Sequence, residues 1–117
     1  MRPKSPKLLD DIGIAAEFIF AFIDGKSFSD YERDMLVRSA VERQFTIIGE
    51  ALTRLRSADP GVLNEITEHQ KIIGFRHRLA HGYDEDIDNA EVWRIIQSSL
   101  PKLHSEVRGL LAAIEEP

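Results

Sequence analysis

Apolar residues recur along this chain at alternating intervals of three and four positions, which is the spacing of one face of an α-helix. Four stripes carry this period: Leu9, Ile12, Ala16, Ile19 and Ile23; Val41, Phe45, Ile48, Leu52 and Leu55; Ile72, Phe75 and Leu79; and Trp93, Ile96, Leu100, Leu103, Val107, Leu110 and Ile114. No segment sustains the alternation of apolar and polar residues that is typical of a half-buried strand. The pattern therefore predicts an all-helical protein.

Capping residues and helix breakers set the expected bounds of the first two helices. Ser5 is the expected N-cap of the first helix, and Pro6 fits its first position, where an N–H has no helical partner. Ser29 and Glu32 have the spacing of a capping box, which predicts the start of a long second helix. The breakers expected to end these two helices are Asp24-Gly25 and Asp59-Pro60-Gly61.

The third helix is the one that leads into the most polar part of the chain. We expect it to begin near Thr67, which has the spacing of a capping box with Gln70. It should run to about His81, immediately before Gly82. A short helical turn is expected before it, at residues 62–66.

The last helix is expected to begin at Asp88, with Glu91 three residues further on. Its apolar stripe keeps its register across Pro101, so the pattern predicts one helix that is kinked at the proline. Four amphipathic helices with short connections predict an all-α protein, an antiparallel four-helix bundle with a short extra helical turn.

A second apolar stripe on the long second helix indicates a contact outside the bundle. Its residues lie beside the main stripe, which already faces the expected core. A helix with two such stripes has apolar surface left over for a partner, so we expect the protein to form a homodimer. The residues of this second stripe are Leu36, Ala40, Ile47 and Ala51.

Length and composition narrow the class of protein. The 117 residues are long enough for one hydrophobic core and too short for two, so a single domain over residues 1–117 is expected. The chain has no cysteine, which excludes disulfides and thiolate metal sites. It contains no apolar run that suits a signal peptide or a membrane span, so we expect a cytoplasmic protein without a membrane partner.

The charge pattern makes any contact with nucleic acid a local one. The net charge is −5, whereas a general nucleic-acid binder usually carries a basic surface, and binding of DNA is not expected. Residues 71–83 nevertheless contain cations and histidines and no acid, and a strongly acidic run follows at 84–88. Such a pattern is also typical of a solvated loop with a helix cap. The cations and histidines are Lys71, Arg76, His77, Arg78 and His81.

These residue types can together cleave an RNA phosphodiester bond without a metal. One group removes the proton of the 2′-hydroxyl, another protonates the leaving 5′-oxygen, and a cation stabilises the crowded phosphate. Histidine moves protons near neutral pH, and the arginine fork fits phosphate oxygens. Arg76 and His81 are five residues apart, however, and project about 140° from one another on a straight helix. Either the helix unwinds at Gly82, or two copies of the segment meet across a dimer, which we favour.

Two other interpretations of the same residues remain open. An arginine and a histidine near a helix end often form an ordinary surface or capping feature. His77 and His81 lie four residues apart on one face, which also suits a metal. Zinc would need further ligands, and His69 and His104 are candidates that nothing in the sequence places nearby. We therefore expect no metal and no cofactor.

The segment from Ile73 to Asp84 resembles the signature of HEPN-domain proteins, in which an arginine is followed by a polar residue and, a few positions later, by a histidine. It more narrowly resembles the HepT-like branch, whose signature continues to a tyrosine two residues after the histidine. Arg76, His81 and Tyr83 match these positions, and His77 supplies the polar residue. The resemblance extends to flanking residues 42–52 and 92–101.

The resemblance implies a dimeric helical bundle that cleaves RNA in one cleft without a metal. In this chain Arg76 would contact the phosphate, and His81 would be the general acid and base. His77 and Arg78 would support the site or contact RNA. Glu50 resembles a polar position that faces the cleft in relatives, although it could equally be a solvated residue on the second helix.

The resemblance also implies a regulatory partner. HepT-like toxins are paired with an MntA-like nucleotidyltransferase antitoxin, which transfers AMP to the tyrosine of the motif. That residue would be Tyr83, and the chain would be the toxin of a toxin–antitoxin pair. An alternative function is a non-catalytic helical module that partners a nucleotidyltransferase, with its acidic surface against a basic one.

Overall fold

The computed structural model describes residues 1–81 and 87–115, and for Ala80, His81 and Glu115 it describes the helical backbone without the side chain. The described residues form seven helices and no strand, which confirms the all-helical prediction. No described helix is long and apolar enough to cross a membrane. The helices are α1 (Ser5–Ile23), α2 (Phe28–Arg33), α3 (Met35–Ala58), α4 (Pro60–Leu63), α5 (His69–His81), α6 (Asn89–Gln97) and α7 (Ser99–Glu115).

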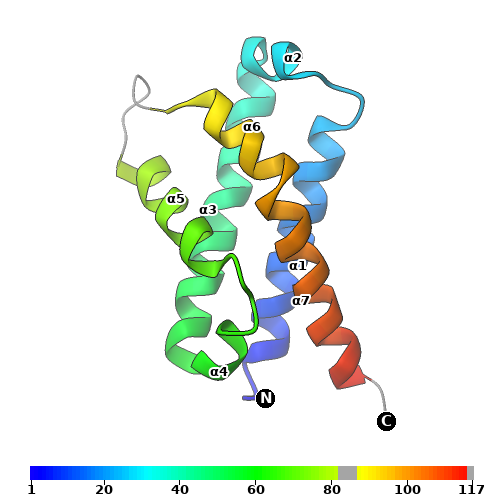
Figure 1. Ribbon diagram of the computed structural model, residues 1–117, viewed down its shortest axis with the longest axis vertical. Coiled ribbons are helices and arrows are strands. Elements are labelled where there is room, and N and C mark those ends of the chain that lie inside the picture. Colours follow the sequence, from blue (N-terminus) through cyan, green and yellow to red (C-terminus); the bar gives the residue numbers. More distant parts are fainter. Residues whose placement is uncertain (82–86, 116–117) are drawn as a thin grey trace.

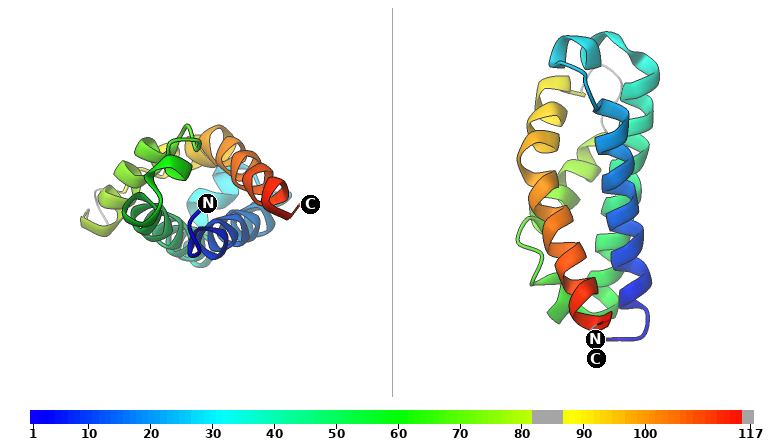
Figure 2. Two further views of the ribbon diagram at one scale, coloured as in Figure 1. Left: turned by 90° about the horizontal axis from the view of Figure 1, so that it is seen from below. Right: turned by 90° about the vertical axis from the view of Figure 1, so that its right-hand side faces the viewer.

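Four helical rods form the antiparallel bundle, and α2 and α4 lie at its two ends. Helices α1 and α5 run in one direction, while α3 and the pair α6–α7 run in the other (Figure 1). Helix α1 packs against α3 and α7, and α3 also packs against α5. Seen along the bundle, α5, α3, α1 and α7 follow one another around the core (Figure 2). The bundle prediction is confirmed.

The predicted apolar stripes make up most of the core. Their residues on α1 and α3 are fully or almost fully buried, except for the half-buried Ile23 at the end of α1. The stripe residues that are buried on the other helices are Ile72, Phe75, Ile96, Leu100, Leu103 and Val107. Helix α2 adds Tyr31, whose ring lies 5.5 Å from that of Trp93 on α6. Burial raises the pKa of the Tyr31 phenol. The aromatic contact explains how so short a helix is held against the bundle.

The predicted long second helix is in fact two helices. The capping box is formed by Ser27 and Asp30, two residues earlier than the predicted pair, and it begins the short helix α2. Asp34 then leaves the helical conformation, with φ −108° and ψ 92°, and its carboxylate accepts a hydrogen bond from the N–H of Val37. Because Asp34 ends one helix and caps the next, α3 begins at Met35.

The predicted single last helix, kinked at Pro101, is also wrong. Helix α6 ends at Gln97, Ser98 takes φ −120° and ψ −67°, and α7 begins at Ser99. Proline lacks the N–H that would bond to the carbonyl four residues earlier, and its ring clashes with that carbonyl. For Pro101 this carbonyl belongs to Gln97, which is where the helix stops. The proline itself lies in the first turn of α7, where it is tolerated.

Two predicted caps are replaced by contacts between distant parts of the chain. Ser5 is inside α1, and its hydroxyl donates to the Asp59 carboxylate at 2.8 Å. Thr67 lies before α5, and its hydroxyl and N–H donate to Glu106 of α7. The short turn predicted at residues 62–66 is α4, which begins earlier because Asp59 caps it.

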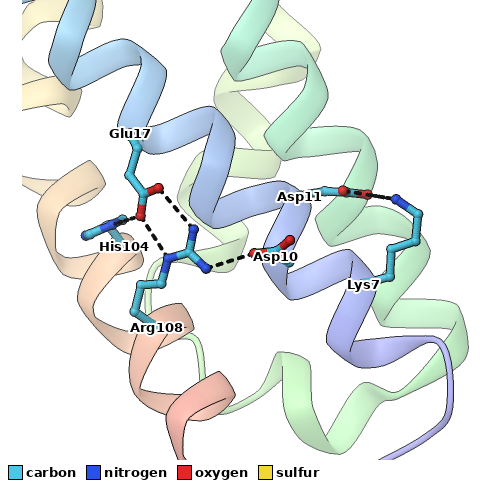
Figure 3. A network of polar contacts seen from close by, with 6 residues as sticks. All are labelled: Lys7, Asp10, Asp11, Glu17, His104 and Arg108. Atoms are coloured by element: carbon cyan, nitrogen blue, oxygen red, sulfur yellow. Dashed lines mark hydrogen bonds and ion pairs between the residues drawn. The ribbon is translucent and has the colours of Figure 1, made fainter. Parts of the chain in front are cut away.

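A network of polar contacts joins α1 to α7 (Figure 3). The Arg108 guanidinium donates to both carboxylate oxygens of Glu17 and to Asp10, and His104 contacts Glu17 at 2.8 Å. A Cβ at Gly13 would lie 2.6 Å from the Arg108 guanidinium carbon, so a larger residue there would displace the guanidinium from this position. Hydrogen bonds from Arg108 and His104 lower the pKa of Glu17 to about 2.

The second stripe on α3 is only partly available to a partner. Ala51 is 5% exposed and belongs to the core of its own chain, while Leu36 is 80% exposed. Ala40 and Ile47 are half-buried. On α3, the apolar surface that could meet a second chain is therefore at the start of the helix, where Met35 is also exposed.

Candidate functional site

Helix α5 carries most of the predicted site, and aromatic packing fixes it against α3. The ring of Phe75 is 2% exposed and meets Phe45 of α3 edge-on, with centroids 5.0 Å apart. Ile72, one turn earlier, is fully buried. Two adjacent turns of α5 are thus held by the core, so the polar residues between and beside them have a defined position.

Arg76 lies on the side of α5 that faces α3, directly over Gly49. A Cβ built at Gly49 would be 2.4 Å from Cγ and 2.5 Å from Cβ of Arg76. Carbon atoms in contact normally lie about 3.5–4.0 Å apart. The absence of a side chain at Gly49 therefore lets the stem of Arg76 lie against the α3 backbone. Gly74 has no such role, because a Cβ there would meet only Arg78 at 4.0 Å.

Glu50 is the charged neighbour of Arg76. Its Oε1 lies 3.6 Å from Nη2 of Arg76, and the two side chains are 43% and 25% exposed. The Nε of Arg76 is buried and has no hydrogen-bond partner among the described residues. The guanidinium is thus held on one side by its carboxylate neighbour and remains partly open to solvent. Glu50 therefore pairs with Arg76, while its side chain also remains in contact with solvent.

Arg78 lies on the opposite side of α5, beside α6. Its Nε and Nη2 both donate to Oε1 of Glu91, the former at 3.0 Å. Its guanidinium carbon also lies 5.8 Å from the centroid of the Phe75 ring. Because residues two apart on a helix point in nearly opposite directions, Arg76 and Arg78 face different neighbouring helices. The structure does not bring these two cations together.

Of the remaining predicted site residues, His77 is described in full, His81 only in its backbone, and Tyr83 not at all. His77 is exposed on the outer surface of α5. His81 is the last residue of that helix, and its side chain lies outside the described residues. Tyr83 lies outside them altogether. Among the side chains that are described, no three of His, Asp or Glu form a group that could hold a metal ion. His104, a ligand candidate from the sequence, is in the network of α1 and α7.

Sequence reasoning overlooked Gly49. It lies within the flank 42–52 that resembles the HEPN family, but the reasoning there singled out Glu50. The spacing between a glycine on one helix and an arginine on another says nothing of their contact. Only the packing of α3 on α5 reveals it.

Comparison with known proteins gives a consistent result. Residues 12–110 match the family described as Ribonuclease HepT-like. A "putative RNase" of Caldanaerobacter subterraneus subsp. tengcongensis is 31% identical over 114 residues, covering 92% of this chain and 96% of that protein. A second protein of the same description, from Methanocaldococcus jannaschii, is 29% identical over 103 residues and covers 85% and 89%. No solved structure matches the chain.

Proposed function

The chain belongs to the HepT-like ribonuclease family, and on that premise we propose that it is a metal-independent endoribonuclease and the toxin of a toxin–antitoxin pair. The observation that carries the proposal is the setting of Arg76. Its stem is fixed over Gly49, Glu50 lies beside it, and its guanidinium is partly open to solvent. A fixed, accessible guanidinium suits a phosphate that gains charge in the transition state.

The proposed reaction needs only the RNA and two imidazoles. A neutral His81 takes the proton of a 2′-hydroxyl, and the 2′-oxygen bonds to the adjacent phosphorus. The bond from phosphorus to the 5′-oxygen breaks, and a protonated His81 gives its proton to that oxygen. The products are a 2′,3′-cyclic phosphate and a 5′-hydroxyl. Arg76 binds the non-bridging oxygens throughout.

A dimer supplies both imidazoles in this proposal. One His81 cannot be both base and acid in the same step, and Arg76 and His81 do not share a face of one straight helix. A composite cleft with two copies of the motif removes both difficulties. The exposed apolar residues at the start of α3, Leu36 and Met35, support association with a second chain.

The proposed partner is an MntA-like nucleotidyltransferase antitoxin that modifies Tyr83. The phenol oxygen of Tyr83 would bond to the α-phosphorus of ATP, with release of pyrophosphate. AMP on this residue adds negative charge two positions from His81, which would repel RNA from the site. Intact mass detects the modification as a gain of about 329 Da.

The direct test is cleavage of a single-stranded RNA by purified protein, free of AMP, in the presence of a chelator. We expect cleavage that is abolished by Arg76→Ala and by His81→Ala and retained by Arg56→Ala, which removes an exposed arginine at the far end of α3. Products with a cyclic phosphate are expected. No cleavage by the unmodified protein in chelator would refute a metal-independent ribonuclease, and tight co-purification with a nucleotidyltransferase would then favour a non-catalytic module.

Mixed dimers test whether the site is composite. An isolated mixed dimer of one wild-type chain and one His81→Ala chain has a single His81 imidazole at its cleft. We expect this mixed dimer to have almost no cleavage activity, because the proposed step needs one His81 as the base and the other as the acid. About half of the wild-type activity, in mixed dimers verified by mass, would place a complete working site on one chain.

A further inference from the structure

A cleft of about 340 Å³ lies between α5 and α6, on the side of α5 away from Arg76. Helix α5 contributes Lys71 and Arg78 to it, which are seven residues apart and so share a face. Helix α6 contributes Glu91, Arg94 and Ile95, and Ser98 lines the cleft just after the end of this helix. Lys71 and Arg78 belong to the run of cations and histidines at residues 71–83, and Arg94 comes from outside this run.

The cleft has a net positive charge, because its cations outnumber its carboxylates. Three cations line it against one carboxylate, and that carboxylate, Glu91, is bonded to Arg78. In the part of the chain that the structure describes, neither Lys71 nor Arg94 has a carboxylate within ion-pair distance, and both are exposed. Among the residues that the structure describes, two cations of the cleft therefore remain for a ligand, in a protein whose net charge is −5.

The remaining groups favour an anionic ligand over a neutral one. Ile95, which is 4% exposed, gives the cleft an apolar wall, and the Ser98 hydroxyl already donates to the carbonyl of Arg94. A lysine acts as a point charge and an arginine as a planar fork, and both bind phosphate oxygens. A chain of phosphates fits two cations in line better than a single small anion does.

The cleft and the candidate site lie on opposite sides of the same helix, α5. Arg76 faces α3, whereas Lys71 and Arg78 face α6, so the two lie across α5 from each other. A helix with its side chains is about 10–12 Å wide. A strand bound at both would cross the outer surface of α5, where His77 is exposed.

We propose that the cleft of Lys71, Arg78 and Arg94 binds backbone phosphates of single-stranded RNA on one side of the scissile bond. This rests on the proposed ribonuclease activity, for which Arg76 binds the scissile phosphate. The cleft holds the strand, and it takes no part in proton transfer. Because the contacts are with phosphates, they are independent of the base sequence.

The test is RNA binding by the full chain carrying His81→Ala, so that the strand is not cut. Lys71→Gln with Arg94→Gln removes the two available charges, and Lys4→Gln with Arg54→Gln removes two from a groove between α1 and α3 as the matched control. Loss of two phosphate contacts should flatten the slope of log K against log salt by about 1.4 for a single strand. Both pairs of substitutions are at exposed positions, so thermal unfolding should be little changed.

Length dependence gives a second readout. In the His81→Ala protein, the cleft variant should bind a long single strand more weakly than the control variant does. In the protein that keeps His81, both variants should cleave a dinucleotide at the same rate. An unchanged salt slope in the cleft variant would overturn the proposal even where the wild-type protein cleaves RNA. A flattened slope, together with no cleavage by the protein that keeps His81, would support the cleft and refute the ribonuclease. Equal losses in both variants would show a diffuse charge effect and overturn the cleft.

Discussion

Replacing Gly49 with alanine is the sharpest test of how the fold positions Arg76. The added Cβ would lie 2.4 Å from Cγ and 2.5 Å from Cβ of Arg76, more than 1 Å inside a normal contact of about 3.5–4.0 Å. A rotation about χ1 moves Cγ but cannot move Cβ, which is fixed to the backbone. Helix α5 must therefore shift relative to α3, or the two helices must separate locally.

The energetic cost can be isolated with a second glycine. Overpacking of this kind costs about 1–3 kcal/mol, while alanine in place of glycine inside a helix gains about 1 kcal/mol. Gly109 lies on α7, where a Cβ would meet no atom within 4 Å. Gly109→Ala thus gains the helix propensity alone. The difference between the two variants, about 1–3 kcal/mol in the free energy of unfolding, is the cost of the clash.

The effect on cleavage should exceed the effect on stability. A displacement of about 1 Å at a positioning residue can lower a rate by about a hundredfold. We expect Gly49→Ala to lower kcat for RNA by at least tenfold, with circular dichroism unchanged and Gly109→Ala at the wild-type rate. The measurements are urea unfolding and single-turnover cleavage. If Gly49→Ala were as stable as Gly109→Ala and cleaved RNA normally, Arg76 would not lie over Gly49.

Three further predictions concern residues around the same core. Glu50→Gln should lower cleavage several-fold by loosening Arg76, with a stability change below about 1 kcal/mol, because the pair is partly exposed; an unchanged rate would contradict this. Phe75→Ala should cost about 3–5 kcal/mol in urea unfolding, because the ring is almost fully buried. Hydrogen bonds from Arg108 lower the pKa of Glu17 from 4.5 to about 2. They therefore stabilise the folded protein fully above pH 4.5, and this stabilisation is lost as the pH falls to 2. Across this pH range, the free energy of unfolding should fall less in Glu17→Gln than in the wild-type protein.

The bundle was predictable because its core follows a local rule. Each apolar stripe repeats at three and four positions, and these residues became the buried faces of α1, α3 and the last rod. The helix ends were harder, since several side chains compete for each cap. Ser27 caps α2 ahead of the predicted start, Asp34 divides the predicted second helix, and both have the residue types of a cap. Sequence alone gives no means of ranking them against Ser29.

Caps that depend on distant residues could not be predicted at all. Ser5 has the right type and position for an N-cap, but its hydroxyl is bonded to Asp59, which is far away in the chain. Thr67 is bonded in the same way to Glu106. The break before Pro101, in contrast, follows from a local rule, because the missing bond is always to the carbonyl four residues earlier. The apolar stripe keeps its register across Pro101, and for that reason a single kinked helix was predicted instead of a break.

The sequence suggests the residue types of the candidate site but not the contacts that support them. Arginine and histidine at the end of a polar helix suggested the chemistry, and the spacing of Arg76 and His81 already indicated that one straight helix is insufficient. The contact of Arg76 with Gly49 and the approach of Arg94 to Lys71 arise between helices. Such contacts depend on the rotation of each helix about its axis, which the period of the stripe defines only roughly.

The two sides of α5 allow substrate holding and chemistry to be separated by experiment. Gly49→Ala acts on the α3 side, so it should lower kcat and leave the salt slope of RNA binding unchanged, because no phosphate contact of the cleft is lost. Lys71→Gln with Arg94→Gln acts on the α6 side and should raise KM and flatten the slope, with kcat near the wild-type value at saturating RNA. Opposite patterns in the two variants require a strand that crosses α5. If both variants changed kcat and the slope together, the two sides would form one site, and the division of roles across this helix would be wrong.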